Sequence, residues 1–233
     1  MEDRRIEFTL TEGTRKRERE LVLASGSPRR RQLLGLLGVE FEVVVSDVDE
    51  SVVTVADPTV NAMETARLKA VAVAERVGDG VVVLGSDTNV AFGELILGKP
   101  RDEREAFETL VMLRGKVHQV HTGVVLMSGV SAEIHQFTHT SDVHMRDYTD
   151  EDIIAYIKTG HPMDKAGAYG IQHPDFRPVA HYTGCYASVM GLPICELADP
   201  LRKMGLVLPE AIVTDCPNGA CYRQSEFDPL FVC

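Results

Sequence analysis

The chain has 233 residues, of which 44% are hydrophobic and 25% are charged, as in ordinary soluble globular proteins. Its formal net charge of −11 at pH 7 argues against a general nucleic-acid or anionic-membrane surface, because both need dominant positive charge. No apolar run reaches the length of a membrane-spanning helix and residues 1–20 contain no signal-peptide core, so we expect a cytoplasmic protein that binds neither nucleic acid nor membrane.

The first predicted element follows a polar, charged segment, residues 1–19, which we expect to be a flexible N-terminal extension. Residues 21–24 are apolar and predict a short buried strand. Ser27 is a preferred N-cap and Pro28 suits the first helical position, so a helix is expected to start there and to end near Gly38. Such strand–turn–helix connections are typical of α/β domains.

Three arginines lie in the first turn of this predicted helix. The helix dipole disfavours Arg29, Arg30 and Arg31 at that position unless an anion sits between them. The turn, which contains Ser25 and Ser27, also directs unpaired backbone N–H groups at one spot. The pattern predicts a site for phosphate oxygens; the alternative is an ordinary turn with solvated arginines.

An acidic run follows the second predicted strand, residues 41–45. It contains Asp47, Asp49 and Glu50. One interpretation is a solvated acidic loop, which is the usual role of such runs. The other is a divalent-cation site, because Mg²⁺ often takes only one or two carboxylates together with substrate phosphates. The residues alone leave both interpretations open.

A helix and a buried strand are predicted next. The helix covers residues 58–77, and its apolar stripe leaves Lys69 facing solvent. Residues 81–84 form a continuous apolar run, which is typical of a strand buried on both faces. This strand is expected to end at the polar cluster 85–89, so that Asp87 emerges where α/β folds often place catalytic residues. The alternative is that Asp87 only caps a turn.

A hairpin is expected after this strand. Its returning strand, residues 95–97, leads directly to Lys99. Gly98 and Pro100 flank this lysine, one permitting close approach of the backbone and the other stiffening it. Lys99 is therefore expected to be held more tightly than a typical surface lysine. A helix over residues 103–114 follows.

The second half of the chain begins with two predicted strands, residues 117–126 and 133–143. Their histidines are expected on a solvated polar face rather than as metal ligands. A helix capped by Thr149 should end at Gly160. Another helix, after Pro193, is expected to close the domain.

Two further segments complete the chain. Small residues dominate 163–172 and would let the backbone run close to a ligand. Within it, Gln172 carries both a donor and an acceptor, as recognition of a nucleobase edge requires. The remainder, residues 207–233, is expected to be a C-terminal tail. Its Cys216 and Cys221 do not have the spacing of a usual zinc site.

Several short motifs appear in a fixed order along the chain. They are LASGSPRR at 23–30, SDVDE at 46–50, LKA at 68–70, GSDT at 85–88, LGKP at 97–100, HTGV at 121–124, MDKAGAYGIQ at 163–172 and GLP at 191–193. Over residues 20–206 the chain resembles the Maf, or septum-formation-like, family of nucleoside triphosphate pyrophosphatases. The resemblance implies an α/β fold related to the inosine triphosphatases, with an elongated mixed central sheet and two lobes flanking a deep nucleotide cleft.

The resemblance also implies an activity and the residues that support it. Family members hydrolyse a nucleoside triphosphate to the monophosphate and pyrophosphate with a divalent cation, Mg²⁺ or Mn²⁺, and are often homodimers. Asp87 matches the proton acceptor and is also expected at the metal. Asp49, with the adjacent Glu50, matches the acidic metal position. Lys69 and Lys99 match the lysines that contact phosphate.

Three residues point to the branch of the family that prefers dTTP and UTP. Arg29, Thr88 and Gln172 match its pattern, which implies hydrolysis of dTTP, UTP and modified pyrimidine nucleotides. Arg30 is expected to contact the phosphates, and Arg31 to be solvated. The alternatives are a 7-methyl-GTP pyrophosphatase of the sister branch, or a non-catalytic nucleotide-binding protein that regulates cell division.

The chain departs from the family pattern near these positions. Ser86 stands where the family usually has Ala, and Asn89 where it usually has a hydrophobic residue. Residues 173–178 replace a Gly-rich loop after Gln172. This loop is expected near the nucleobase, so the departures leave the exact nucleotide preference open.

Overall fold

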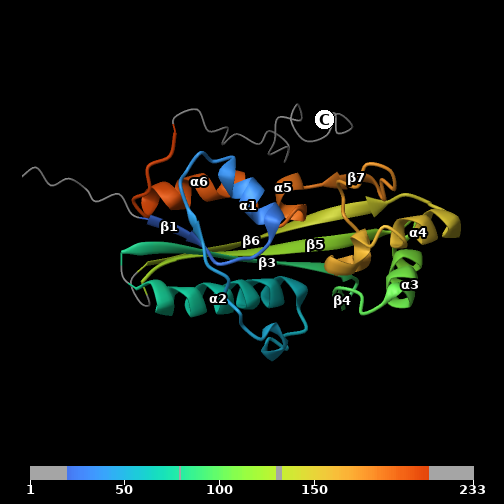
Figure 1. Cartoon of the computed structure of the whole chain (residues 1–233), viewed down its shortest axis with the longest axis horizontal. Helices are drawn as coiled ribbons and strands as arrows, with labels where there is room; N and C mark the ends of the chain where they lie inside the picture. Colours follow the sequence, from blue (N-terminus) through green and yellow to red (C-terminus); the bar gives the residue numbers. More distant parts are fainter. Residues whose placement is uncertain (1–19, 79, 130–132, 210–233) are drawn as a thin grey trace, which may run out of the picture.

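The computed structural model describes residues 20–209 except 79 and 130–132. The predicted N-terminal extension and residues 210–233 of the predicted tail, with Cys216 and Cys221, lie outside the described residues. The described chain forms a long mixed sheet of seven strands. Helix α2 covers one face, and α1, α5 and α6 cover the other, whereas α3 and α4 lie beyond one end (Figure 1). The prediction of an elongated α/β fold with a mixed central sheet is confirmed.

The strands and helices have the following bounds. The strands are β1 (Glu20–Leu23), β2 (Glu42–Val43), β3 (Val81–Phe92), β4 (Leu95–Leu97), β5 (Val117–Ser128), β6 (Glu133–Met145) and β7 (Val179–Thr183). The α-helices are α1 (Pro28–Gly35), α2 (Pro58–Val77), α3 (Glu103–Leu113), α4 (Asp150–Ile157), α5 (Tyr186–Val189) and α6 (Ile194–Lys203). Three short 3₁₀ helices are η1 (Glu50–Val52), η2 (His161–Asp164) and η3 (Ala166–Ala168).

The sheet has the order β2-β1-β3-β5-β6-β7, with β4 paired to β3. β1 runs parallel to both β2 and β3. The pairs β3–β4, β3–β5, β5–β6 and β6–β7 are antiparallel. β3 is thus the strand that joins the parallel part to the antiparallel part, and its middle lies near the centre of the sheet.

Two glycines let α2 lie directly on the sheet. A Cβ at Gly85 in β3 would lie 2.3 Å from the backbone oxygen of Ala66, and one at Gly123 in β5 would lie 2.5 Å from that of Ala62. Ala62, Ala66 and Ala70 form the matching small-residue stripe and are fully buried. This close packing brings the side chains of α2 down onto the middle of β3.

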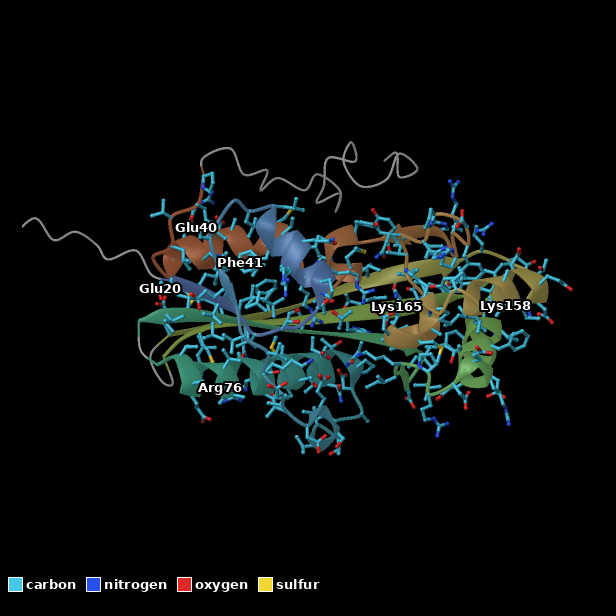
Figure 2. The ribbon with its side chains drawn as sticks, viewed as in Figure 1. Glu20, Glu40, Phe41, Arg76, Lys158 and Lys165 are labelled. Carbon is cyan, nitrogen blue, oxygen red and sulfur yellow. The ribbon has the colours of Figure 1, made fainter. Side chains whose placement is uncertain are left out.

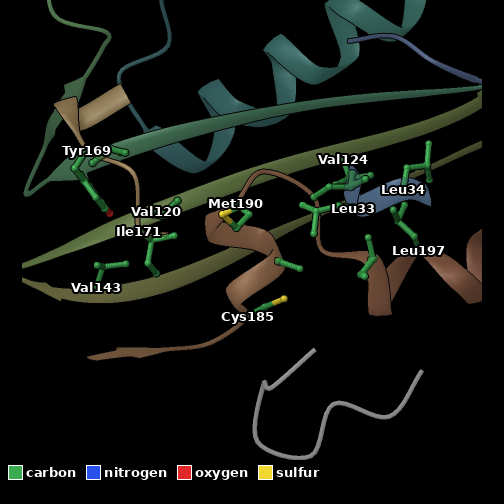
Figure 3. Packing of buried hydrophobic residues seen from close by; sticks show 14 of the residues in the cluster. Leu33, Leu34, Val120, Val124, Val143, Tyr169, Ile171, Cys185, Met190 and Leu197 are labelled. Carbon is green, nitrogen blue, oxygen red and sulfur yellow. The ribbon is translucent and has the colours of Figure 1, made fainter. Parts of the chain in front are cut away.

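The opposite face of the sheet carries the larger hydrophobic core. Figure 3 shows Leu33 and Leu34 of α1 and Leu197 of α6 near Val124 of β5. The same cluster continues along the sheet to Tyr169 and beyond. It also includes Leu208, two residues beyond the predicted end of the domain at 206. Burial on both faces explains why the central strands read as nearly continuous apolar runs.

Several local expectations were wrong, among them the solvated face expected for the histidines of the two long strands, since His118 and His121 are buried. β3 does not end at residue 84 but runs to Phe92, and its polar residues still pair with β5, so Asp87 lies inside a strand rather than after it. Lys69 is only 7% exposed because the glycine contacts pull α2 onto the sheet. The second strand is shorter than predicted, and neither β7 nor α5 was predicted.

Candidate active site

A cavity of about 940 Å³ lies beside the middle of β3, between the part that pairs with β1 and the part that pairs with β4. Its walls come from the turn before α1, the segment after β2, β3, the segment after β4 and residues 161–172. Ten of the eleven predicted site residues line it: Ser25, Ser27, Arg29, Arg30, Glu50, Lys69, Asp87, Thr88, Lys99 and Gln172. Segments far apart in the sequence therefore meet at one cleft.

Lys69 lies between two carboxylates on one wall of the cleft. Its Nζ is 2.7 Å from Asp87 Oδ1 and 2.9 Å from Glu50 Oε1. The side chains of Lys69 and Asp87 are 8% and 12% exposed, whereas that of Glu50 is 56% exposed. These contacts hold the Lys69 amine against both carboxylates, so the group offers one fixed cation and two carboxylates to the cleft.

Arg30 makes three hydrogen bonds within the protein. Its Nε donates to the Gly191 backbone oxygen at 3.0 Å, Nη1 to Ser25 Oγ at 3.2 Å and Nη2 to Thr88 Oγ1 at 3.2 Å. Burial lowers the pKa of Arg30, and the negative charge of Asp87 opposes this effect. The guanidinium joins the turn before α1, strand β3 and the α5–α6 connection, so it holds three walls of the cleft together.

Thr88 belongs to a directed chain of hydrogen bonds. Thr122 Oγ1 donates to the Ser188 backbone oxygen at 2.8 Å and lies 3.0 Å from Thr88 Oγ1. Because the Thr122 proton is already used, the Thr88 hydroxyl donates to Thr122 and accepts from Arg30. Thr88 therefore positions Arg30 and anchors α5 to the sheet.

Both departures from the family pattern in β3 have structural partners. Ser86 is fully buried and donates to the Gly191 backbone oxygen at 2.9 Å. Asn89 Nδ2 donates to Asn61 Oδ1 at 2.9 Å and to the Pro58 backbone oxygen at 3.2 Å. Since buried polar groups are costly only when unpaired, these residues add contacts to the loop after α5 and to the start of α2.

The turn before α1 has the predicted helix start. Ser27 Oγ accepts the Arg30 backbone N–H at 3.5 Å, and Ser25 Oγ accepts the Ser27 backbone N–H at 3.3 Å. Pro28 is the first residue of the helix. Arg29 is half-buried and lines the cleft, whereas Arg31 is exposed and does not. The arginines therefore have different environments, as expected from the motif.

Asp49 is the predicted site residue that does not line the cleft. Its Oδ1 accepts from Ser51 Oγ at 2.6 Å and from the Ser51 backbone N–H at 3.0 Å, and it caps η1. Those bonds lower the pKa of Asp49. Within the described part of the chain, no three His, Cys, Asp or Glu side chains form a metal-binding group. The carboxylates nearest Lys69 are those of Glu50 and Asp87.

The far wall of the cleft contains residues that were not predicted as site residues. Lys165 (Figure 2) is 6% exposed, pairs with Asp164 and donates to the His161 backbone oxygen at 2.6 Å. All three line the cleft. The sequence signal was present, since Lys165 is the one cation in a run of small residues, but it gave no reason to prefer a ligand over a surface position.

A hydrogen bond between buried side chains holds this wall to the sheet. Tyr169 OH and His118 Nε2 are 2.7 Å apart, and both residues are buried. Burial, with a smaller effect of His144, lowers the pKa of His118 to about 4. Burial also raises the pKa of Tyr169. Both side chains are therefore neutral at pH 7.

A cleft with a helix start, fixed cations and paired carboxylates on an α/β sheet defines the class of hydrolases that act on nucleotide phosphates. The chain belongs to the family described as Maf-like protein, whose model matches residues 20–204. The described helices include none long and apolar enough to cross a membrane.

Several curated proteins are similar to this chain over most of its length. The dTTP/UTP pyrophosphatase of Bacillus cereus (strain ZK / E33L) is 44% identical over 188 residues, which cover 81% of this chain and 97% of that protein. The dTTP/UTP pyrophosphatase of Bacillus cytotoxicus is 46% identical over 185 residues, covering 79% and 95%. A solved HAM1 protein from Coxiella burnetii is 17% identical, with a TM-score of 0.44 and coverage of 79% and 98%.

Proposed function

We propose that this protein hydrolyses dTTP and UTP, and modified pyrimidine nucleotides of similar shape, to the monophosphate and pyrophosphate. The observation that carries the proposal is the contact of buried Lys69 with Asp87 and Glu50 in a cleft lined by further cations. The substrate class is supported by the dTTP/UTP pyrophosphatases that are 44–46% identical to this chain.

Asp87 is the general base in this proposal. Its carboxylate removes a proton from a water molecule, and the resulting hydroxide attacks the α-phosphorus. The bond between the α-phosphorus and the α–β bridging oxygen breaks, so that pyrophosphate leaves with the bond's electrons and the monophosphate gains the oxygen of water. Lys69 orients Asp87 by the 2.7 Å contact.

The cations of the cleft are assigned to the triphosphate. Lys99, Arg29 and the backbone N–H groups at the start of α1 offset the charge on the phosphate oxygens. Arg30 acts chiefly by holding the walls together, because its guanidinium nitrogens already have protein acceptors. Thr88 shares this positioning role, and Gln172, which lines the cleft, is assigned to the edge of the nucleobase because it carries both a donor and an acceptor.

A divalent cation fits Glu50 and Asp87, which line the cleft, better than Asp49, which does not. Glu50 and Asp87 both contact Lys69 Nζ, so two hard oxygen donors face the same space, which suits Mg²⁺ or Mn²⁺ completed by phosphate oxygens. Asp49 is a weaker candidate because it is not among the residues that line the cleft. When bound, the cation would neutralise phosphate charge and polarise the α-phosphoryl group.

A nucleotide panel tests the proposal. Wild-type protein with Mg²⁺ or Mn²⁺ should release pyrophosphate from dTTP and UTP faster than from CTP, 7-methyl-GTP and ITP, with the monophosphate identified by anion-exchange chromatography. Preference for 7-methyl-GTP would assign the chain to the sister activity instead. Nucleotide binding without turnover would support a regulatory protein.

A homodimer in the cytoplasm is also proposed, and light scattering would measure its mass.

A further inference from the structure

His161 lies at the start of η2 and lines the cleft. Its Nδ1 is 2.8 Å from the hydroxyl of Tyr156. The same hydroxyl oxygen accepts the backbone N–H of Gly170 at 3.0 Å. Tyr156 is 2% exposed, so water does not compete for these bonds. The ring of His161 is thus held by a bonded chain that begins in the backbone.

The direction of these bonds determines where His161 carries its proton. The Gly170 N–H can only donate, so it uses an acceptor position of the Tyr156 oxygen. The Tyr156 hydroxyl can still donate its own proton, and Nδ1 of His161 accepts it. A neutral imidazole that accepts at Nδ1 must carry its proton on Nε2.

The neutral form of His161 is also the stable one at pH 7. Burial lowers its pKa to about 4, with further lowering by Lys165, His173 and Arg29, and with Asp164 acting in the opposite direction. The ring also lies 4.7 Å from that of His173, centre to centre. His161 therefore presents a neutral N–H donor.

The Nε2 atom of His161 is open to the cleft. Among the described residues it has no hydrogen-bond partner, yet it is not one of the buried unpaired atoms. The Cε1 atom of the ring, which is bonded to Nε2, packs closely against Gly170: a Cβ added at Gly170 would lie only 2.7 Å from it. This contact restricts the orientation of the ring. The Nε2–H group of His161 is therefore an oriented donor that can bind an acceptor atom of a ligand.

The charges that act on His161 come chiefly from its own part of the chain. They are those of Lys165, His173 and Asp164, with a further effect of Arg29. Asp87 and Glu50 act on Arg30 and are not among the charges that act on His161. His161 also lies on the same wall as Gln172. A neutral donor on the same wall as Gln172 suits an uncharged acceptor better than a phosphate, which favours cations.

We infer that His161 is a specificity-determining residue that donates its Nε2 proton to a carbonyl oxygen of the pyrimidine ring, with Tyr156 as the residue that positions it. This inference rests on the proposed function, and it names how the same cleft selects its substrate. Cytosine carries an amino group in place of the C4 carbonyl of uracil, so a contact to O4 would be lost with CTP, whereas the C2 carbonyl is common to both bases. Such a donor rejects analogues that lack its acceptor.

Sulfur analogues of UTP test the contact, because a thiocarbonyl is a much weaker acceptor than a carbonyl. For one of the two analogues, 2-thio-UTP or 4-thio-UTP, the kcat/KM of wild-type protein is expected to be about 5- to 50-fold below its kcat/KM for UTP. His161→Phe keeps the ring but has no donor, so its kcat/KM should be nearly equal for UTP and that analogue. His161→Gln retains an N–H donor and should keep part of the discrimination. Equal use of UTP and both analogues by wild type, or an unchanged ratio in His161→Phe, would overturn the inference.

Nitrogen NMR of ¹⁵N-histidine-labelled protein gives a readout that needs no turnover. His161 should show a protonated Nε2 and an unprotonated Nδ1, and uridine monophosphate should shift the Nε2 resonance. Tyr156→Phe should disturb this proton placement while the fold, followed by near-UV circular dichroism, is retained. A proton on Nδ1, or no shift with the nucleotide, contradicts the inference. Absence of turnover in wild type would instead overturn the proposed function alone.

Discussion

The two ends of the cleft are held in different ways. The end that we propose to carry the reaction, formed by Glu50, Lys69 and Asp87, depends on close backbone packing between α2 and β3 at Gly85. The end that we propose to bind the nucleobase, formed by the segment 161–172, depends on hydrogen bonds between side chains and on short 3₁₀ helices. Rigid packing suits groups that must meet a reacting atom, whereas a hydrogen-bonded loop segment suits selection of a substrate.

This difference predicts different sensitivities to mutation and pH. The contact at Gly85 contains no group that titrates. The bonds at the nucleobase end involve His118 and His161, whose pKa values burial lowers to about 4. We therefore expect changes in volume to disrupt the packing at Gly85, and acidification to weaken the hydrogen bonds of the nucleobase end.

The largest effect is expected from Asp87→Asn at the reaction end. Asparagine cannot accept the proton of the attacking water, so kcat should fall about 10²- to 10⁴-fold for every nucleotide. Steady-state release of pyrophosphate measures this loss. The far-ultraviolet circular dichroism spectrum should match that of wild type, since the side chain is nearly isosteric. Retention of most of the wild-type kcat would remove Asp87 from the mechanism.

Gly85→Ala should damage the packing that supports the same end. Its new Cβ would meet the Ala66 oxygen at 2.3 Å and the Ala70 Cβ at 2.8 Å, so the free energy of unfolding should fall by about 3 kcal/mol. Urea denaturation measures it. Gly35→Ala is the matched control, because its Cβ would meet nothing within 4 Å, and its stability should not fall. Equal stability of both variants would show that α2 can move away from β3.

Acid should weaken the other end through His118. The folded-state pKa, about 4, lies below the unfolded value of 6.5, so the unfolded chain binds more protons below pH 6.5. The stabilising contribution is complete above pH 6.5 and is lost as the pH falls toward 4, by on the order of 2–3 kcal/mol. Unfolding of wild type and His118→Gln at several pH values should show a flatter profile in the variant. Parallel profiles would contradict this assignment.

Glu50 and Asp49 provide a smaller and more selective test of the metal ligands. Glu50→Gln should raise the Mg²⁺ concentration required for half-maximal activity at least about tenfold, because its carboxylate lies beside Lys69 and lines the cleft. Asp49→Asn should change it by less than about twofold, as for a surface position. The opposite order of effects would return the metal site to Asp49.

Elements with strong local signals were predicted correctly from the sequence. Ser27 with Pro28, and Thr149 with the acidic residues after it, specify helix starts through caps that depend on a few neighbouring residues. The long pair β5–β6 was also predicted, because its alternation and length are clear. β7 and α5 were not, since Val179–Thr183 is a short strand and Tyr186–Val189 is only one turn.

Features that depend on distant contacts could not be predicted in the same way. Lys69 is buried because α2 rests on glycines of two strands, and no pattern within α2 reveals that. Arg30 became a structural connection because the Gly191 oxygen, 161 residues away, lies within its reach. The family resemblance predicted that these residues matter, but their partners required the structure.

The division of the cleft into a reaction end and a nucleobase end is tested most directly by comparing Asp87→Asn with Gln172→Ala on UTP and CTP. Asp87→Asn should lower kcat by the same factor for both nucleotides and leave their ratio unchanged. Gln172→Ala should change the ratio of kcat/KM for UTP and CTP by about tenfold while retaining turnover. A changed ratio in Asp87→Asn, or an unchanged ratio in Gln172→Ala, would contradict the division.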